Sequence, residues 1–210
     1  MRRIAAHYLF PVTRSPIRYG ILELGESGRI HRVIDPRGDL VELPGMVFHS
    51  GLLVPGLIDI PDQEELAWLK AFLSRSSPDT GFAELRSTIK ALPHSHQHSG
   101  LKQVIDQEAI LEKLKKAAQN QKQSPFNQGL NEGLNEKQPP LEQFDEARNQ
   151  EQSSFVQLLK GVTFEGARLL NMEQVMGSFQ PGFKPGVNLV YPFDFSSFHL
   201  RHDSRIYPIT

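Results

Sequence analysis

The sequence contains no cysteine, a single tryptophan and no strong excess of either charge. Without cysteine, the chain forms no disulfide, holds no thiolate-bound zinc and offers no cysteine nucleophile. Its 23 Lys and Arg against 24 Asp and Glu give a formal net charge of −1. Proteins that bind nucleic acids or anionic membranes carry a clear basic excess, so we expect neither partner.

Long apolar runs are also absent. No stretch approaches the ~18 consecutive apolar residues of a membrane span. The first residues, MRRIAAHYLFPVTRSP, lack the uninterrupted apolar core of a signal peptide. We therefore expect a cytoplasmic protein, and 210 residues correspond to one domain or to one domain with an appendage.

The first part of the chain has the pattern of β structure. Short β-prone runs bounded by Gly or Pro occur at 4–10, 17–24, 29–34, 46–48 and 51–60. The polar turn at 25–28 between two of these runs is a hairpin signal. Because no helical pattern separates the runs, they predict antiparallel sheets packed as a small sandwich.

The pattern becomes helical after Pro61 and returns to β in the tail. Apolar residues recur with a helical period at 62–73, 79–92, 104–119 and 153–170. Gly161 and Gly166 mark positions where the last helix is expected to split or bend. Further β-prone runs occur at 187–191 and 204–209. This order predicts that both chain ends share one sheet system, with the helical middle inserted between them.

Residues 120–140 are rich in Gln and Asn and contain two near-identical units, NQGL and NEGL. Few large apolar residues occur here, so little burial is available to offset the entropy lost on ordering the chain. The composition predicts a mobile linker or a long surface loop.

Four parts of the chain resemble one protein family. They are residues 3–22, 51–59 (GLLVPGLID), 158–170 (LLKGVTFEGARLL) and 176–190 (MGSFQPGFKPGVNLV). In this order they are similar to the opening, the G-x-x-V-P-G-F-I-D segment, the closing helix and the GSFEPGKxPGxNLI return to sheet of amidohydrolase-superfamily enzymes. The resemblance is to the chlorohydrolase and cytosine-deaminase type.

In that family the two chain ends form a small composite β-sandwich, and the catalytic (β/α)8 barrel is threaded between them. A barrel takes ~200–250 residues, and the interval from Pro61 to Gln152 is far too short for one. The resemblance therefore implies an α+β fold in which a helical insert replaces the barrel. The expected parts are a composite β-sandwich domain at 1–60 and 171–210, the helical insert at 61–119, the linker at 120–140 and C-terminal helices at 141–170.

The family's first metal ligands are a His-x-His pair directly after the aspartate of the PGxxD segment. The matching positions here are Pro61 and Gln63. Proline has no ligand atom, and an amide is a poor ligand for zinc or iron compared with imidazole. Without a metal-activated water, amidohydrolysis by that mechanism has no nucleophile. We predict a pseudoenzyme without catalytic residues or cofactor, which acts as a non-catalytic binding or interaction protein.

His94, His96 and His98 form the densest cluster of metal-ligand residues in the chain. On an extended segment, alternating histidines point to one side and are able to capture Zn²⁺, Ni²⁺ or Cu²⁺. The other interpretation is a polar loop between two helices, bounded by Pro93 and Gly100. The cluster leaves open an alternative function, a metal-dependent hydrolase acting on C–N bonds with a rebuilt site.

The tail is rich in aromatic residues, which predict a core of alternately inward-facing side chains. The residues are Phe183, Tyr191, Phe193, Phe195 and Phe198. In the alternative interpretation, part of this surface corresponds to the face that packs against the barrel in the family. A large exposed apolar patch marks an interface. We therefore expect the helical insert to cover it, or a partner: a second copy in a homodimer or a full-length amidohydrolase relative.

Overall fold

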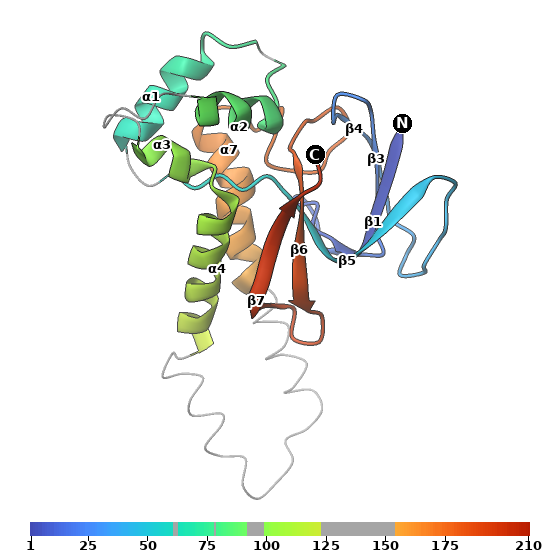
Figure 1. Ribbon diagram of the computed structural model, residues 1–210. Helices are drawn as coiled ribbons and strands as arrows, with labels where there is room; N and C mark the ends of the chain where they lie inside the picture. Colours follow the sequence, from blue (N-terminus) through green and yellow to red (C-terminus); the bar gives the residue numbers. More distant parts are fainter. Residues whose placement is uncertain (61–62, 78, 92–98, 123–153) are drawn as a thin grey trace, which may run out of the picture.

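The computed structural model describes residues 1–60, 63–77, 79–91, 99–122 and 154–210 (Figure 1). Strands from both ends of the chain and the helices between them form one α+β unit. The predicted fold class is therefore confirmed. Most of the predicted linker at 120–140 lies outside the described residues. Within the described ranges, no helix combines the length and apolar character that a bilayer crossing demands.

Within the described part of the chain, seven strands form one hydrogen-bonded sheet. They are β1 (Arg2–Leu9), β2 (Ile17–Arg18), β3 (Ile21–Leu24), β4 (Ile30–Ile34), β5 (Met46–Pro55), β6 (Val187–Asp194) and β7 (His199–Pro208). Their order is β4-β3-β1-β5-β6-β7, and β2 pairs with β1. β5 pairs with β6 over Leu52–Pro55, so the two chain ends meet in one sheet, as predicted.

The pairing of β1 with β5 corrects the expectation of purely antiparallel strands. These two strands run parallel, beginning with Arg3 beside Met46. A parallel pair needs a connection of a dozen or more residues. Here β2, β3, β4 and the loop 35–45 supply that connection without a helix.

β5 is one strand where the sequence pattern suggests two, and Gly51 lies in its middle. Its φ is +139°, a conformation that residues with a Cβ rarely adopt. A Cβ at this position would stand 2.5 Å from the carbonyl oxygen of Val190. The glycine therefore lets β6 approach closely. β5 then ends at Pro55, and the expected strand character at 57–60 is wrong.

The helices lie between β5 and β6 in the chain. They are α1 (Gln63–Leu73), α2 (Phe82–Ala91), α3 (Ser99–Val104), α4 (Gln107–Lys122), a helical segment at 154–160, the π-helix η2 (Gly161–Glu165) and α7 (Gly166–Leu169). The last helix thus changes its winding between Gly161 and Gly166, where the sequence predicts a split or bend.

The helix expected at 104–119 begins at Gln107, and a separate short helix, α3, ends just before it at Val104. Asp106 begins a new helix, because its Oδ1 accepts the Ala109 N–H at 3.2 Å and its carbonyl accepts the Ile110 N–H at 2.9 Å. Asp is a favoured N-cap residue. The apolar pattern continues through the break, which hides it from a periodicity argument.

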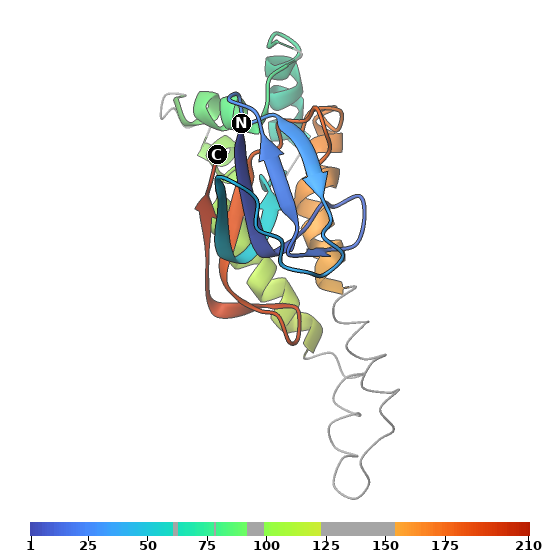
Figure 2. The same cartoon turned by 90° about the vertical axis from the view of Figure 1, so that its right-hand side faces the viewer.

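α4 covers one face of the sheet and runs along β7 (Figures 1 and 2). Its buried residues Ile110, Leu111 and Leu114 share a cluster with Leu52 and Val54 of β5. The same cluster contains Phe155, Phe193 and Phe198. Phe193 and Phe198 therefore lie in the core and Phe195 packs against it, as predicted, whereas Tyr191 is exposed and Phe183 is half-buried outside these clusters.

The other helices of the insert have a core of their own. The buried apolar residues of α1 pack with those of α2, α3 and α7, in a cluster of Leu66, Leu69, Leu73, Phe82, Leu85, Ile89, Leu101, Val104 and Ala167 among others. Figure 2 shows α1 and α2 together beyond one end of the sheet. Of the helical insert that was expected to cover the sheet, α4 packs on it, whereas α1, α2 and α3 pack with one another.

The opposite face of the sheet buries a third cluster. Leu53 of β5 and Leu189 of β6 belong to it, while their neighbours Leu52 and Val190 belong to the α4 face. Successive strand residues point to opposite faces, so both faces of this sheet are apolar where β5 and β6 pair.

Candidate functional site

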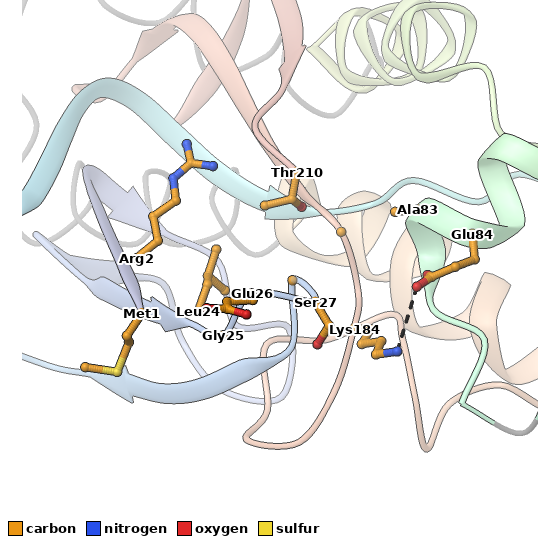
Figure 3. Close-up of a pocket in the computed structure, with 12 residues that line it drawn as sticks. Met1, Arg2, Leu24, Gly25, Glu26, Ser27, Ala83, Glu84, Lys184 and Thr210 are labelled. Carbon is orange, nitrogen blue, oxygen red and sulfur yellow. Dashed lines mark ion pairs between the residues drawn. The ribbon is translucent and has the colours of Figure 1, made fainter.

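A cavity of about 480 Å³ opens between the β3–β4 turn, the first turn of α2 and the chain returning to β6 (Figure 3). Its walls carry charges of both signs. Arg2 and Lys184 are cationic, and Glu26 and Glu84 are anionic. The turn 25–28 adds backbone groups and the hydroxyl of Ser27. The cavity lining therefore contains cationic and anionic side chains as well as neutral hydrogen-bonding groups.

The ammonium group of Lys184 is tightly held. Its Nζ lies 2.8 Å from Oδ2 of Asp79, 3.2 Å from the carbonyl oxygen of Asp79 and 3.7 Å from Oε1 of Glu84. Arg29 pairs with the same Asp79 carboxylate. The hydrogen bond from Lys184, followed by that from Arg29, lowers the pKa of Asp79. Lys184 therefore acts as a fixed charge in the wall and is not arranged as a nucleophile.

The same contacts fasten α2 to the wall. The Gly81 N–H donates to Oε2 of Glu84 at 3.1 Å, and the Phe82 N–H donates to the carbonyl of Lys184 at 2.9 Å. Glu84 thereby caps the helix that carries it while its carboxylate faces Lys184, as Figure 3 shows. A Cβ on Gly81 would stand 2.4 Å from Cβ of Lys184, so a glycine is required at this close approach.

The lining of this cavity offers charged and hydrogen-bonding groups to a ligand. Ser27 carries a hydroxyl group, but no histidine is among the residues that line the cavity. The lining therefore lacks the pair of nucleophile and histidine base that acyl transfer commonly uses. Lining groups of both charges suit a small molecule that is zwitterionic or rich in hydroxyl groups.

The predicted absence of the family's metal ligands concerns another part of the molecule. Gln63 begins α1 with an exposed side chain, whereas Pro61 lies outside the described residues. Within the described ranges, no three His, Cys, Asp or Glu side chains gather as a metal site. His94, His96 and His98 lie outside the described residues, so the metal site suggested for them stays a prediction.

The side-chain amide of Gln107 is hydrogen-bonded to the segment that follows β5. Its Oε1 accepts the Leu57 N–H at 2.8 Å, and its Nε2 donates to the Leu57 carbonyl at 2.8 Å. Oε1 also accepts from Nδ2 of Asn188 at 2.6 Å, and Nε2 donates to the Ile105 carbonyl at 2.8 Å. Both donors and both acceptor positions of the buried amide are thus used, and α4 is joined to β6 and to residue 57.

The next two residues are held by backbone groups of the surrounding helices. The Ile58 N–H donates to the carbonyl of Val162 in η2 at 2.6 Å, and the Asp59 N–H donates to the carbonyl of Val104 in α3 at 2.9 Å. Gly166 permits this contact, because a Cβ there would stand 2.5 Å from the Ile58 carbonyl oxygen. Backbone carbonyls of α3 and η2 therefore hold the chain at residues 58 and 59.

Beside this segment, a second cavity of about 470 Å³ lies between α4 and the helical segment at 154–162. Leu114, Leu158 and Val162 contribute apolar walls, and the ion pair of Asp59 with Lys113 stands among its lining residues. The cavity borders the π-helical turn.

Sequence reasoning missed the residues that organise both regions. Lys184 and Asn188 lie inside the segment 176–190. The sequence analysis used this segment only for its family resemblance and predicted no contact for either residue. Gln107 gave no signal, because a polar residue in the first turn of a helix is most often exposed. Asp79 is an isolated acid between two helices, and its cationic partners lie about 50 and 105 positions away.

Comparisons with known proteins identify no family for the chain. No protein-family model matches it, and no curated protein matches it. Among solved structures, the chain is similar to N-acetyl-D-glucosamine-6-phosphate deacetylase from Mycobacterium smegmatis, with a TM-score of 0.23 and 16% identity. The likeness covers 42% of this chain and 28% of that one. A likeness of this size carries no argument about function, and the family suggested by the sequence motifs stays a prediction.

Proposed function

We propose that this protein is a non-catalytic binding protein, related to metal-dependent amidohydrolases through its composite-domain motifs. One observation carries the proposal: the N–H groups of residues 57–59 and the carbonyl of Leu57 are all hydrogen-bonded, to Gln107, Val162 and Val104. In the resembled family this segment leads directly to the first metal ligands. Here it is hydrogen-bonded to α3, α4 and η2.

The residues at the corresponding positions do not fit a metal. Pro61 offers no donor atom, and Gln63 offers an exposed amide at a helix start. Zinc in catalytic sites is held by imidazole, thiolate or carboxylate groups. We therefore derive no hydrolytic step for this chain.

Metal analysis of the purified protein tests the proposal. Protein prepared without a His tag is expected to contain no stoichiometric zinc, iron or nickel, and to leave amide, amidine and cyclic-ureide substrates intact. The alternative hydrolase makes the opposite prediction. It requires about one equivalent of metal per chain, lost together with activity when His94, His96 and His98 are all changed to Ala.

The cavity of Figure 3 is the binding site that we propose for a small zwitterionic or hydroxyl-rich molecule. A panel of amino acids and sugars is expected to include compounds that raise the melting temperature in a saturable manner. Ala83→Trp, which places a bulky ring at the cavity wall, should abolish this effect. Ala67→Trp is the matched control, because Ala67 is exposed on α1 and does not line the cavity. Equal loss in both variants, or no stabilising compound, would contradict the assignment.

A further inference from the structure

The second cavity, of about 470 Å³, lies between the faces of two helices. Figure 1 shows α4 beside the helix that begins at Ser154. The lining residues on α4 are Lys113, Leu114 and Ala117, and those on the facing helix are Ser154, Gln157, Leu158, Gly161 and Val162. Within each set the residues are spaced by one, three or four positions, as on one face of a helix. Two regular helix faces therefore bound the cavity.

The inner surface of this cavity is apolar. Leu114 belongs to the buried cluster that packs on the sheet, and Leu158 and Val162 pack against that cluster while staying partly exposed. From Ser154 to Gly161 the facing helix extends by about 10 Å, at 1.5 Å per residue. An aliphatic chain of that length would cover the exposed parts of these side chains, and removing apolar surface from water is favourable.

Gly161 leaves the cavity open on the side of the facing helix. Among the described residues, a Cβ placed there would meet no atom within 4 Å apart from its chain neighbours and the backbone of its own helix. Gly166, one turn later, is different, because a Cβ there would collide with the backbone of Ile58. No contact within the described chain thus requires a glycine at 161, and its missing side chain adds width to the cavity.

One part of the cavity is polar and carries an ion pair. The Lys113 ammonium pairs with Oδ2 of Asp59, whose side chain is 25% exposed. The N–H of Asp59 is held by the Val104 carbonyl at 2.9 Å, which fixes the backbone that carries the carboxylate. Among the described residues, Lys113 is the one hydrogen-bond partner of that carboxylate. Oδ1 of Asp59 and the remaining protons of the ammonium are therefore available to a ligand.

This ion pair selects for the charge of a bound head group. An uncharged hydroxyl or primary amide both donates and accepts, so it is able to bond to Asp59 and to Lys113 without separating them. A carboxylate only accepts and would face the charge of Asp59. An ammonium only donates and would face the charge of Lys113. The neutral head group is the one that both side chains stabilise.

We propose that the second cavity binds a small uncharged amphiphile. Its aliphatic chain lies along Leu114 and Leu158, and its hydroxyl or primary amide bonds to the pair of Asp59 and Lys113. An apolar lining with a few polar groups is typical of ligand sites. The site shares no lining residue with the cavity of Figure 3, so this inference does not rest on the proposed function.

Isothermal titration calorimetry of the intact protein tests the proposal with octan-1-ol, octanoate and octylamine. Octan-1-ol should bind saturably, and the two charged compounds should bind at least about fivefold more weakly. Gly161→Phe fills the cavity and should weaken octan-1-ol binding at least about tenfold. Gly161→Ala is the matched control, because one methyl group leaves most of the space open. Ala117→Phe fills the cavity from α4 and replaces Gly161→Phe if that variant does not fold.

An exchange of head groups tests the role of the ion pair. Asp59→Asn releases Lys113, so octanoate should then bind about fivefold more tightly than octan-1-ol, since charge-assisted hydrogen bonds are the stronger ones. Lys113→Met releases Asp59 and should favour octylamine in the same way. Ala83→Trp, which alters the cavity of Figure 3, should leave octan-1-ol binding unchanged.

Four results would overturn this assignment. They are the lack of saturable octan-1-ol binding, equal binding by Gly161→Phe and Gly161→Ala, an unchanged order of the three compounds in both charge variants, and loss of octan-1-ol binding in Ala83→Trp. The last result would move the amphiphile to the cavity of Figure 3. A protein that binds octan-1-ol but none of the amino acids and sugars would contradict only the proposed use of that other cavity.

Discussion

The two edges of the sheet at β7 and at the start of β5 differ in how they are covered. At β7, the Ile206 N–H donates to Oε1 of Glu108 at 3.3 Å, and Nζ of Lys115 donates to the His202 carbonyl at 3.2 Å. Both side chains belong to α4. At Met46–Ser50, no strand of the described chain pairs with the outer edge, and the side chains there are largely apolar.

This difference shows what the helical insert does for the sheet. α4 lies over the β7 face with its apolar residues and satisfies backbone groups at the β7 edge with its charged residues. Open edges promote association, so α4 protects this side of the molecule. The edge of β5 has no such cover, and substitutions near each edge should reveal the contrast.

The largest effect is expected for Gln107→Leu. This change removes all four hydrogen bonds of the buried amide and leaves the N–H and carbonyl of Leu57 without partners. Each buried group left unpaired costs about 1–3 kcal/mol, so the free energy of unfolding should fall by about 3 kcal/mol or more. Urea denaturation measures the loss. If the variant loses less than the exposed control Gln103→Ala, the amide does not anchor α4.

An intermediate effect is expected for Glu23→Gln, near the start of the open edge. The buried Glu23 carboxylate accepts from Nε of Arg3 at 2.8 Å and from Nε of Arg32 at 3.0 Å. Arg3 also donates to the Pro44 carbonyl at 2.7 Å, which positions the entry to β5. Loss of the charged acceptor should cost about 2 kcal/mol at neutral pH, measured by urea denaturation.

The pH dependence of this effect has a definite sign. The pKa of Glu23 is lowered below its ordinary value of 4.5, chiefly by the hydrogen bond from Arg3 and further by that from Arg32. A lowered pKa in the folded state stabilises the protein above pH 4.5, and this contribution is lost as the pH falls through the folded pKa. The difference in the free energy of unfolding between wild type and Glu23→Gln should therefore shrink as the pH falls below 4.5. A gap that stays constant with pH, or an equal response of the exposed control Glu26→Gln, would contradict this role of Glu23.

The smallest effect is expected for Lys115→Met at the guarded edge. The variant keeps most of the apolar stem but removes the donor to the His202 carbonyl, at a cost of about 1 kcal/mol. Because the β7 edge would then be less protected, self-association should also increase in light scattering. Lys116→Met, on the exposed side of α4, is the control. Equal behaviour of the two variants would remove the contrast between the edges.

Local patterns in the sequence were enough to place most of the secondary structure. Period-two runs located the strands, and a helical period located α1 and α2 to within a few residues. The glycines at 161 and 166 correctly marked the change of winding in the last helix. The break at Asp106 was missed, because apolar residues on both sides preserve the helical period and only the N-cap contact reveals the new start.

Contacts between distant parts of the chain were beyond such patterns. The parallel pairing of β1 with β5 depends on how the intervening strands fold back. The partners of Gln107 lie 50 and 81 positions away in the sequence, and a single amide has no periodicity to announce them. The cavity of Figure 3 is lined by the end of β3, the first turn of α2 and the chain before β6. Because these parts are far apart in the sequence, none of them alone predicts the cavity.

The sequence by itself determined the α+β class and the union of both chain ends in one sheet system, because these follow from local periodicity. The tertiary structure decided that α4 and the helical segment at 154–160 pack on the sheet, that α1–α3 pack in a separate core and that Gln107 holds the segment after β5. Those outcomes depend on which buried polar groups find partners across the chain. Folding brings such partners together, whereas a linear pattern records only the residues that are near in sequence.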